Sequence, residues 1–312
     1  MKIAQGTFIN LLTRKVVATM SIDRHAKRRL RLASALVAAG LLALPSYATP
    51  YFFSTGNVDG RMAAASRSVS AGKTEIEAAD DFVIASRSQI TSATFTGLLT
   101  GNAAPATVGD VTVEIYRIFP KDSTNPPSGN VPTRINSPSD NVFDSREAAA
   151  GTLSFSTSTL AFSFTAANTV LNGINKIPNQ TTGGEGPVTG KEVQFTVAFS
   201  TPFDLPADHY FFIPQVQVTG GEFYWLSSVR PIVAPGTPFA PDLQAWIRNA
   251  ALDPDWLKIG TDIVGGNPPP TFNEAFTLTG QVVPEPSSLA LFGIAILGLF
   301  GVQKRGRRSG PN

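Results

Sequence analysis

The chain has 312 residues, with 25 Lys or Arg, 23 Asp or Glu and no cysteine. The absence of cysteine excludes disulfides, thiol catalysis, cysteine-ligated zinc and iron–sulfur clusters, so a domain of this size must be held by its apolar core. Twelve basic residues but only one acidic residue lie before residue 49 or after Gln303, which leaves a body with 13 basic and 22 acidic residues. Such an acidic body repels nucleic-acid phosphates, so no nucleic-acid partner is expected.

The start of the chain has the three parts of a secretory signal peptide in the usual order. A basic cluster is followed by an apolar run over residues 32–44, and small residues then lead to Ala48. Signal peptidase requires small residues just before its cleavage site, which predicts a cut between Ala48 and Thr49. Residues 1–48 are therefore expected to be a signal helix, handled by the export machinery and signal peptidase. Met20 is an alternative start of translation, because the residues before it have no function in such a signal.

Residues 49–282 are predicted to form one all-β ectodomain. The runs KEVQFTVAF and DVTVEIYRIF alternate apolar with polar or small residues, as half-buried strands do. Breaks such as NQTTGGEGPVTG and VGGNPPP are rich in turn-forming residues. This pattern predicts an antiparallel two-sheet sandwich, jelly-roll-like, with roughly nine to twelve strands. The apolar residues that share one face of each run are Val193, Phe195, Val197 and Phe199 in the first, and Val111, Val113 and Ile115 in the second.

The segment DLQAWIRNAAL departs from the alternating pattern. Leu243, Trp246, Ile247 and Ala250 have helical spacing, and Asp242 stands where a helix N-cap would be. The same tryptophan also suits a strand that covers a sheet edge. A short helix and an irregular strand are therefore both open.

Residues suited to catalysis are few in the predicted mature body. Its one histidine is His209, for which Asp204 or Asp208 is a conceivable orienting partner in a catalytic triad. Its place at the head of an aromatic strand favours a packing or hydrogen-bonding role instead. With one histidine and no cysteine, no two-histidine metal motif can exist. The sequence thus predicts no catalytic residue, no metal site and no cofactor.

Two alternatives depend on the acidic residues of the body. Asp253 or Asp255 together with Glu222 is a candidate acid pair for a polysaccharide hydrolase. Several carboxylates together are also suited to calcium, since calcium prefers oxygen ligands. Neither alternative has a recognisable residue spacing, and solvated surface or turn capping explains most of these residues.

The three tryptophans are candidate contacts for a glycan. Exposed indole rings stack on the apolar C–H faces of sugars, and a protein of a polysaccharide-rich environment has use for such a surface. The alternative is a role in the core or over a sheet edge. The residues concerned are Trp225, Trp246 and Trp256.

The end of the chain has a short apolar run followed by basic residues. Residues 289–302 carry no charge, and residues 287–302 are predicted to be a transmembrane helix of nearly minimal length. Positively charged flanks stay on the cytoplasmic side, so the ectodomain is expected on the outer side of the membrane. The basic residues are Lys304, Arg305, Arg307 and Arg308.

A three-residue motif precedes this run. Pro284, Glu285 and Pro286, with the apolar run and the arginines, resemble the PEP-CTERM sorting signal of exopolysaccharide-producing Gram-negative bacteria, over residues 283–308. The resemblance implies a transient partner, the membrane-embedded transpeptidase exosortase, which removes the tail and passes the body to the cell surface or the medium. AADDF and FNEAFTLTG also resemble the borders of β-sandwich ectodomains carried by such proteins.

The sequence as a whole predicts an exported protein that is not an enzyme. Its expected role is structural or adhesive, in an extracellular matrix that contains exopolysaccharide. A polysaccharide-binding module that uses calcium and a polysaccharide hydrolase are the alternatives.

Overall fold

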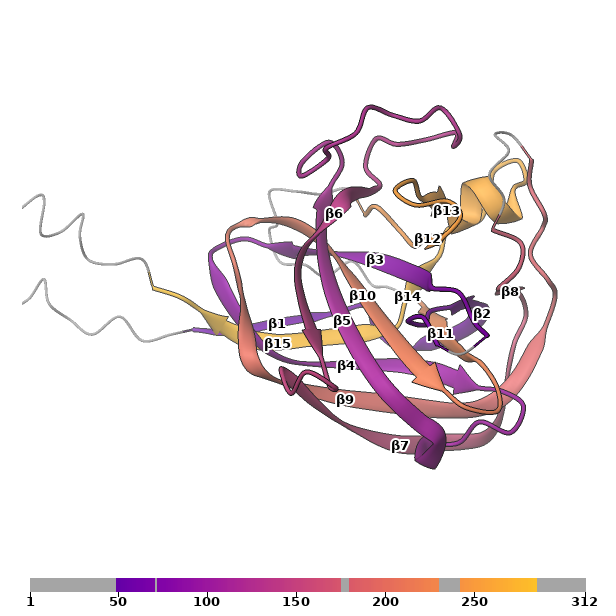
Figure 1. The fold of residues 1–312 in the computed structure, drawn as a ribbon, viewed down its shortest axis with the longest axis horizontal. Helices are drawn as coiled ribbons and strands as arrows, with labels where there is room; N and C mark the ends of the chain where they lie inside the picture. Colours follow the sequence, from indigo (N-terminus) through magenta and orange to yellow (C-terminus); the bar gives the residue numbers. More distant parts are fainter. Residues whose placement is uncertain (1–48, 71, 175–179, 230–241, 285–312) are drawn as a thin grey trace, which may run out of the picture. The chain divides into compact units, whose positions relative to one another are not determined.

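A computed structural model describes residues 49–70, 72–174, 180–229 and 242–284 (Figure 1). Residues Ala48–Val283 form one compact unit. The signal helix and the helix expected at residues 287–302 lie outside the described residues and stay predictions. Within the described residues, no helix has the length and apolar character needed to cross a membrane.

The described residues form fifteen strands in two sheets. Nine strands form the larger sheet: β1 (Pro50–Ser54), β2 (Val58–Ala65), β4 (Ser88–Leu99), β7 (Leu153–Ala166), β8 (Thr169–Val170), β9 (Val188–Leu205), β11 (Phe223–Ser228), β14 (Asn273–Glu274) and β15 (Phe276–Val282). Six strands form the smaller sheet: β3 (Ile76–Ile84), β5 (Val108–Ile118), β6 (Pro138–Glu147), β10 (Asp208–Val218), β12 (Trp246–Asn249) and β13 (Leu257–Lys258). Two short helical segments are η1 (Pro105–Thr107) and η2 (Ile259–Val264).

The strand count exceeds the roughly nine to twelve strands that the sequence pattern predicts. Three of the fifteen strands, β8, β13 and β14, have two residues each. A two-residue strand is too short to show any alternation of apolar and polar residues. The predicted number of strands was therefore too low because the sequence pattern cannot reveal strands this short.

The strand pairing confirms the antiparallel two-sheet prediction. The larger sheet has the order β1-β15-β4-β11-β2-β8, with β9 between β4 and β7 and with β14 beside β11; the smaller has the order β13-β12-β3-β10-β5-β6. The one parallel pair in the described residues is β2 with β8. The jelly-roll likeness of the connections stays a prediction.

The core lies between the two sheets and is rich in aromatic rings. Phe95 of β4 and Phe212 of β10 come from different sheets, and their ring centroids are 6.4 Å apart. Phe212 also stacks on Phe276 of β15 at 5.0 Å. Full burial of one such ring contributes about 1.5–3 kcal/mol to folding. The seven alternating apolar residues that the sequence singled out are all buried.

Trp246–Asn249 of the segment DLQAWIRNAAL form the strand β12 and none of its residues is helical, so the helical alternative is wrong. Trp246 pairs with Ala79 of β3 and with Lys258 of β13, so sheet hydrogen bonds use the backbone groups that a helix needs. The side chain of Asp242 accepts a hydrogen bond from the N–H of Gln244 at 3.0 Å and caps a turn. Gln244 itself has φ +67°, a left-handed conformation that interrupts a helix.

The smaller sheet is covered on both faces. Besides the main core, a second apolar cluster packs on its other side, and all nine residues of β3 are buried. Because of this second cluster, charged side chains of β3 are also enclosed in the protein. The cluster consists of Ala79, Tyr116, Phe211, Ile213, Leu243, Trp246 and Trp256.

Candidate functional site

The two ends of the ectodomain lie side by side. β1 and β15 pair antiparallel, with Pro50 opposite Gln281 (Figure 1). The N–H of Val283 donates to the carbonyl of Arg87 at 2.8 Å, so the backbone is held up to the residue before Pro284. The expected signal cleavage site and the sorting motif therefore border one strand pair. Ala48, Glu285, Pro286, Lys304, Arg305, Arg307 and Arg308 lie outside the described residues.

The three tryptophans are buried and offer no platform for a glycan. Trp225, Trp246 and Trp256 are 0%, 1% and 0% exposed. The indole N–H of Trp225 donates to the carbonyl of Ala275 at 3.0 Å, and that of Trp246 donates to the carbonyl of Leu243 at 3.0 Å. The proposal that they stack on sugars is corrected by this burial, because each indole face is covered by protein.

His209 has a buried acidic partner that the sequence did not indicate. Its Nε2 lies 2.6 Å from Oδ2 of Asp81, which is 128 residues away in the chain. Asp208 instead contacts the Lys121 ammonium at 2.6 Å. Asp204 contacts the Arg87 guanidinium at 2.9 Å. Neither expected partner orients the ring, and the buried pair has the packing and hydrogen-bonding role that was the favoured interpretation.

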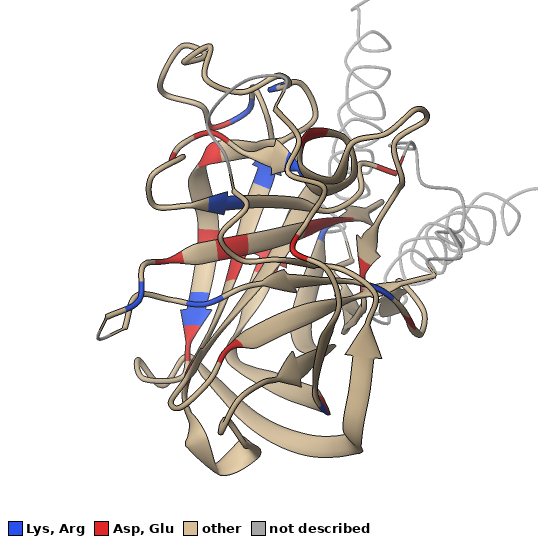
Figure 2. Cartoon of the chain, turned by 90° about the vertical axis from the view of Figure 1, so that its right-hand side faces the viewer, with Lys and Arg blue, Asp and Glu red and all other residues tan. Residues whose placement is uncertain are grey.

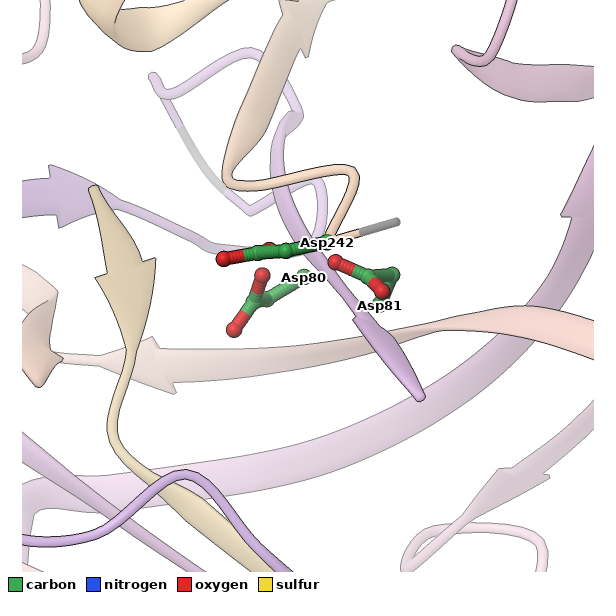
Figure 3. Close-up of side chains that lie close together, drawn as sticks. All are labelled: Asp80, Asp81 and Asp242. Atoms are coloured by element: carbon green, nitrogen blue, oxygen red, sulfur yellow. The ribbon is translucent and has the colours of Figure 1, made fainter. Parts of the chain in front are cut away.

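Asp81 belongs to a group of three carboxylates. One oxygen from each of Asp80, Asp81 and Asp242 lies within 4.8 Å of the others (Figure 3). Such a set of oxygens is of the type that calcium binds. The pair Asp80–Asp81 comes from AADDF on β3, and Asp242 begins the segment that leads into β12. Because the third residue is distant in sequence, no local spacing could have revealed the group.

Hydrogen-bond donors from the protein already engage these carboxylates. Asp81 Oδ1 accepts from the N–H groups of Leu243 and Gln244, both at 3.0 Å. Asp80 Oδ2 accepts from the N–H of Glu274 at 2.9 Å. The group thus ties β3 to β14 and to the start of β12, which is a structural role.

A second buried network surrounds Arg248 of β12. Its Nε contacts Glu77 Oε2, and its Nη2 donates to the Tyr116 hydroxyl at 2.8 Å. The guanidinium lies 4.4 Å above the Trp256 ring. Burial, and next the charge of Glu77, raise the pKa of Glu114 to about 8. This network explains how the smaller sheet tolerates enclosed charges, because the guanidinium is paired and hydrogen-bonded.

The carboxylates of the hydrolase alternative belong to separate ion-pair groups. Glu222 lies 2.7 Å from Arg67 and 3.0 Å from Lys73. Asp255 lies 2.8 Å from Arg134. Asp253 pairs instead with Arg248, at 2.8 Å. Figure 2 shows acidic and basic positions distributed over the described strands and loops.

A groove of about 350 Å³ opens on the outer face of the larger sheet. Its polar lining includes Thr94 and Thr277, whose hydroxyl oxygens are 2.6 Å apart, and Gln194 with Glu192 from β9. Burial raises the pKa of Glu192. An apolar wall is provided by Phe164 and its neighbours. The wall residues are Val58, Leu160 and Phe164.

The groove combines hydroxyl, amide and carboxyl groups with an aromatic ring. Such a lining suits a polyol, whose hydroxyl groups need hydrogen bonds while its C–H faces need apolar contact. The groove was not predicted, since its lining comes from segments that are far apart in sequence, including positions on β4, β7, β9 and β15.

Comparison with known proteins identifies the tail. Residues 282–308 match the family described as the PEP-CTERM protein-sorting motif. No curated protein and no solved structure is significantly similar to the chain. The match begins at Val282, the last residue of β15. The chain therefore carries a PEP-CTERM sorting motif directly after its last strand, which implies export, anchoring through the carboxyl end and processing by an exosortase.

Proposed function

We propose that the chain is a surface or matrix protein with a structural or adhesive role among extracellular polysaccharides. The tail holds the ectodomain on the outer side of the inner membrane until exosortase cuts near Pro284. The released domain then reaches the cell surface or the medium. The observation that carries this proposal is the PEP-CTERM motif at residues 282–308, immediately after β15.

The groove supports contact with polysaccharide. Its hydroxyl, amide and carboxyl groups lie beside Phe164 on an outer sheet face, where a long polymer has access from the solvent. The acidic balance of the body also favours a neutral or cationic glycan over an anionic one. Exopolysaccharide is therefore the proposed ligand of the groove.

A role as a binder rather than an enzyme is part of this proposal. His209 is buried against Asp81, and the acidic residues considered for hydrolysis are engaged by arginines or a lysine. These contacts support a structural role, not a catalytic one, for His209 and for these acidic residues. Assay of the ectodomain for release of reducing sugar from the host polysaccharide tests this point, and sustained release would favour the hydrolase alternative.

Intact-mass measurement of the protein collected outside cells tests the sorting step. We expect a mass that lacks both residues 1–48 and residues 289–302. Replacing Glu285 in the motif with Gln is expected to leave the chain in the membrane fraction. Pro127→Ala, at an exposed position in another proline-containing loop, is the control and is expected to be processed normally. Extracellular protein that keeps residues 289–302 would overturn the proposal.

Calorimetric titration of the processed protein with the host polysaccharide tests the adhesive role. Phe164→Ala and Gln194→Ala are each expected to weaken binding about tenfold, which corresponds to about 1.4 kcal/mol. Thr196→Ala changes an exposed residue of the same strand outside the groove lining and is expected to have no effect. Absence of binding by the unmodified protein would remove the adhesive role and leave the sorting step intact.

A further inference from the structure

The sheet edges of this ectodomain differ in how well they are protected. β1 is short and begins with Pro50, and β8, β13 and β14 have two residues each. β6 has ten residues, but it contains a proline, several charged residues and two register shifts against β5. Shortness, proline, charge and irregular pairing are the features that keep strand edges from pairing with other chains.

β7 is long, and its first half lacks these protective features. It runs for fourteen residues with the sequence LSFSTSTLAFSFTA, which contains no charged residue and no proline. Within the described residues it pairs with β9 alone, and Figure 1 shows it at the lower margin of the ribbon. Its register against β9 is regular from Leu153 to Thr159 and shifts only beyond that point. Seven regular residues exceed the usual length of a strand, about 5–6 residues.

The far half of β7 exposes large apolar side chains. Phe162 is 86% exposed and Leu160 is 50% exposed. These residues lie where the register shifts, next to the regular segment. An uncharged strand edge with exposed apolar neighbours is the type of surface on which β-strand addition occurs.

We propose that the regular segment of β7, residues 153–159, pairs antiparallel with the same segment of a second copy of this chain. The two larger sheets then continue into each other across a two-fold axis. A second copy suits this edge because the segment is uncharged, so self-pairing brings no like charges together. The pairing uses the backbone groups of an edge, and it depends neither on the sorting step nor on the groove.

The two-fold axis determines which residues face each other. In an antiparallel pair of identical strands, the numbers of any two facing residues have the same sum. Side chains alternate between the two faces of a sheet, so the joined sheets present the same face only when that sum is even. The register that overlaps the whole segment places Ser156 opposite itself and Ser154 opposite Ser158. All three side chains are exposed in the single chain.

Cysteine cross-linking of the full-length chain tests this arrangement. The chain has no cysteine of its own, so every disulfide reports the introduced residue. Ser156→Cys is expected to give a disulfide-linked dimer on mild oxidation, because facing Cα atoms in an antiparallel pair are about 4.5–5.5 Å apart. A mixture of Ser154→Cys and Ser158→Cys chains is expected to give a mixed dimer.

The control lies on the neighbouring strand. Thr196 faces Ser156 across the β7–β9 pair, and it is also exposed but one strand further in. Thr196→Cys is expected to give no disulfide-linked dimer under the same conditions, because the two Thr196 positions are kept apart by both copies of β7. Equal cross-linking of Thr196→Cys and Ser156→Cys, or no cross-linking of Ser156→Cys, would overturn the proposal.

A charge variant provides an independent measurement. Ser156→Lys places two ammonium groups opposite each other. We expect this variant to be a monomer, and light scattering measures its molar mass. Thr196→Lys adds the same charge one strand inward and is expected to remain dimeric. Matching circular dichroism spectra and melting temperatures would show that both variants are folded. A monomeric unmodified protein, or a dimeric Ser156→Lys variant, contradicts edge pairing.

Discussion

The N–H of Val282 donates a hydrogen bond to the carbonyl oxygen of Thr49 at 2.8 Å. Thr49 is the expected first residue of the exported chain, and Val282 is the first residue of the PEP-CTERM match. The folded ectodomain thus holds the expected beginning of the mature protein against the beginning of the matched motif. We therefore expect the last strand pair to limit the access of exosortase to the motif.

Inserting a spacer tests this limit. A six-residue Gly-Ser linker between Val283 and Pro284 adds a reach of about 20 Å and separates the motif from the β1–β15 pair. We expect a larger processed fraction at early times in a pulse-chase measurement. The same linker after the exposed turn residue Gly151 is the control and leaves processing unchanged. A slower reaction with the spacer would show that the enzyme needs the folded edge.

Loss of the Asp81 carboxylate is expected to destabilise the ectodomain strongly. Asp81→Ala leaves His209 and two backbone N–H groups buried without their acceptor, which costs about 3–5 kcal/mol. Asp204→Ala removes the exposed pair with Arg87 and is expected to cost less than about 1 kcal/mol. Urea unfolding of the two variants compares these values. Similar costs would contradict a structural role for Asp81.

The raised pKa of Glu114 predicts a pH dependence of stability. Its folded-state pKa is about 8 and its ordinary value is 4.5, so the folded state holds a proton that the unfolded chain releases. The associated stability is fully present below pH 4.5 and is lost as the pH rises through 8, with a limiting slope of about 1.4 kcal/mol per pH unit. Glu114→Gln should flatten this part of the profile in urea unfolding. An unchanged slope would assign it to other groups.

The burial of the tryptophans predicts both a spectrum and a stability effect. Native fluorescence is expected to be blue-shifted and poorly quenched by acrylamide, because all three indoles are buried. Trp225→Ala should cost about 3–5 kcal/mol through the cavity that it leaves. Phe162→Ala, at an exposed ring, should change stability by less than about 0.5 kcal/mol. Strong quenching of the folded protein would contradict the burial.

Calcium is expected to leave the melting temperature of chelator-treated protein unchanged. Both oxygens of Asp81 already accept hydrogen bonds from the protein, which leaves the three-carboxylate group poorly suited to a cation. A rise in melting temperature with calcium that disappears in Asp242→Asn would instead identify a metal site. Scanning fluorimetry distinguishes the two outcomes.

The sequence by itself determined the features that are local in the chain. Alternation of apolar and polar residues from Val193 to Phe199 predicted a half-buried strand, because side chains of a strand point alternately to its two faces. The proline motif with its apolar run and basic end likewise indicated sorting, since these parts follow one another directly along the chain.

The tertiary structure decided everything that depends on contacts between distant segments. Asp81, not Asp204 or Asp208, meets His209 because β3 and β10 pair. Pairing with β3 made β12 a strand, although the spacing of the apolar residues in this segment also suited a helix. Burial of the tryptophans and the makeup of the groove follow from how the sheets pack and pair. These outcomes were not predictable because a residue's own neighbours in sequence do not specify which distant residue will cover it.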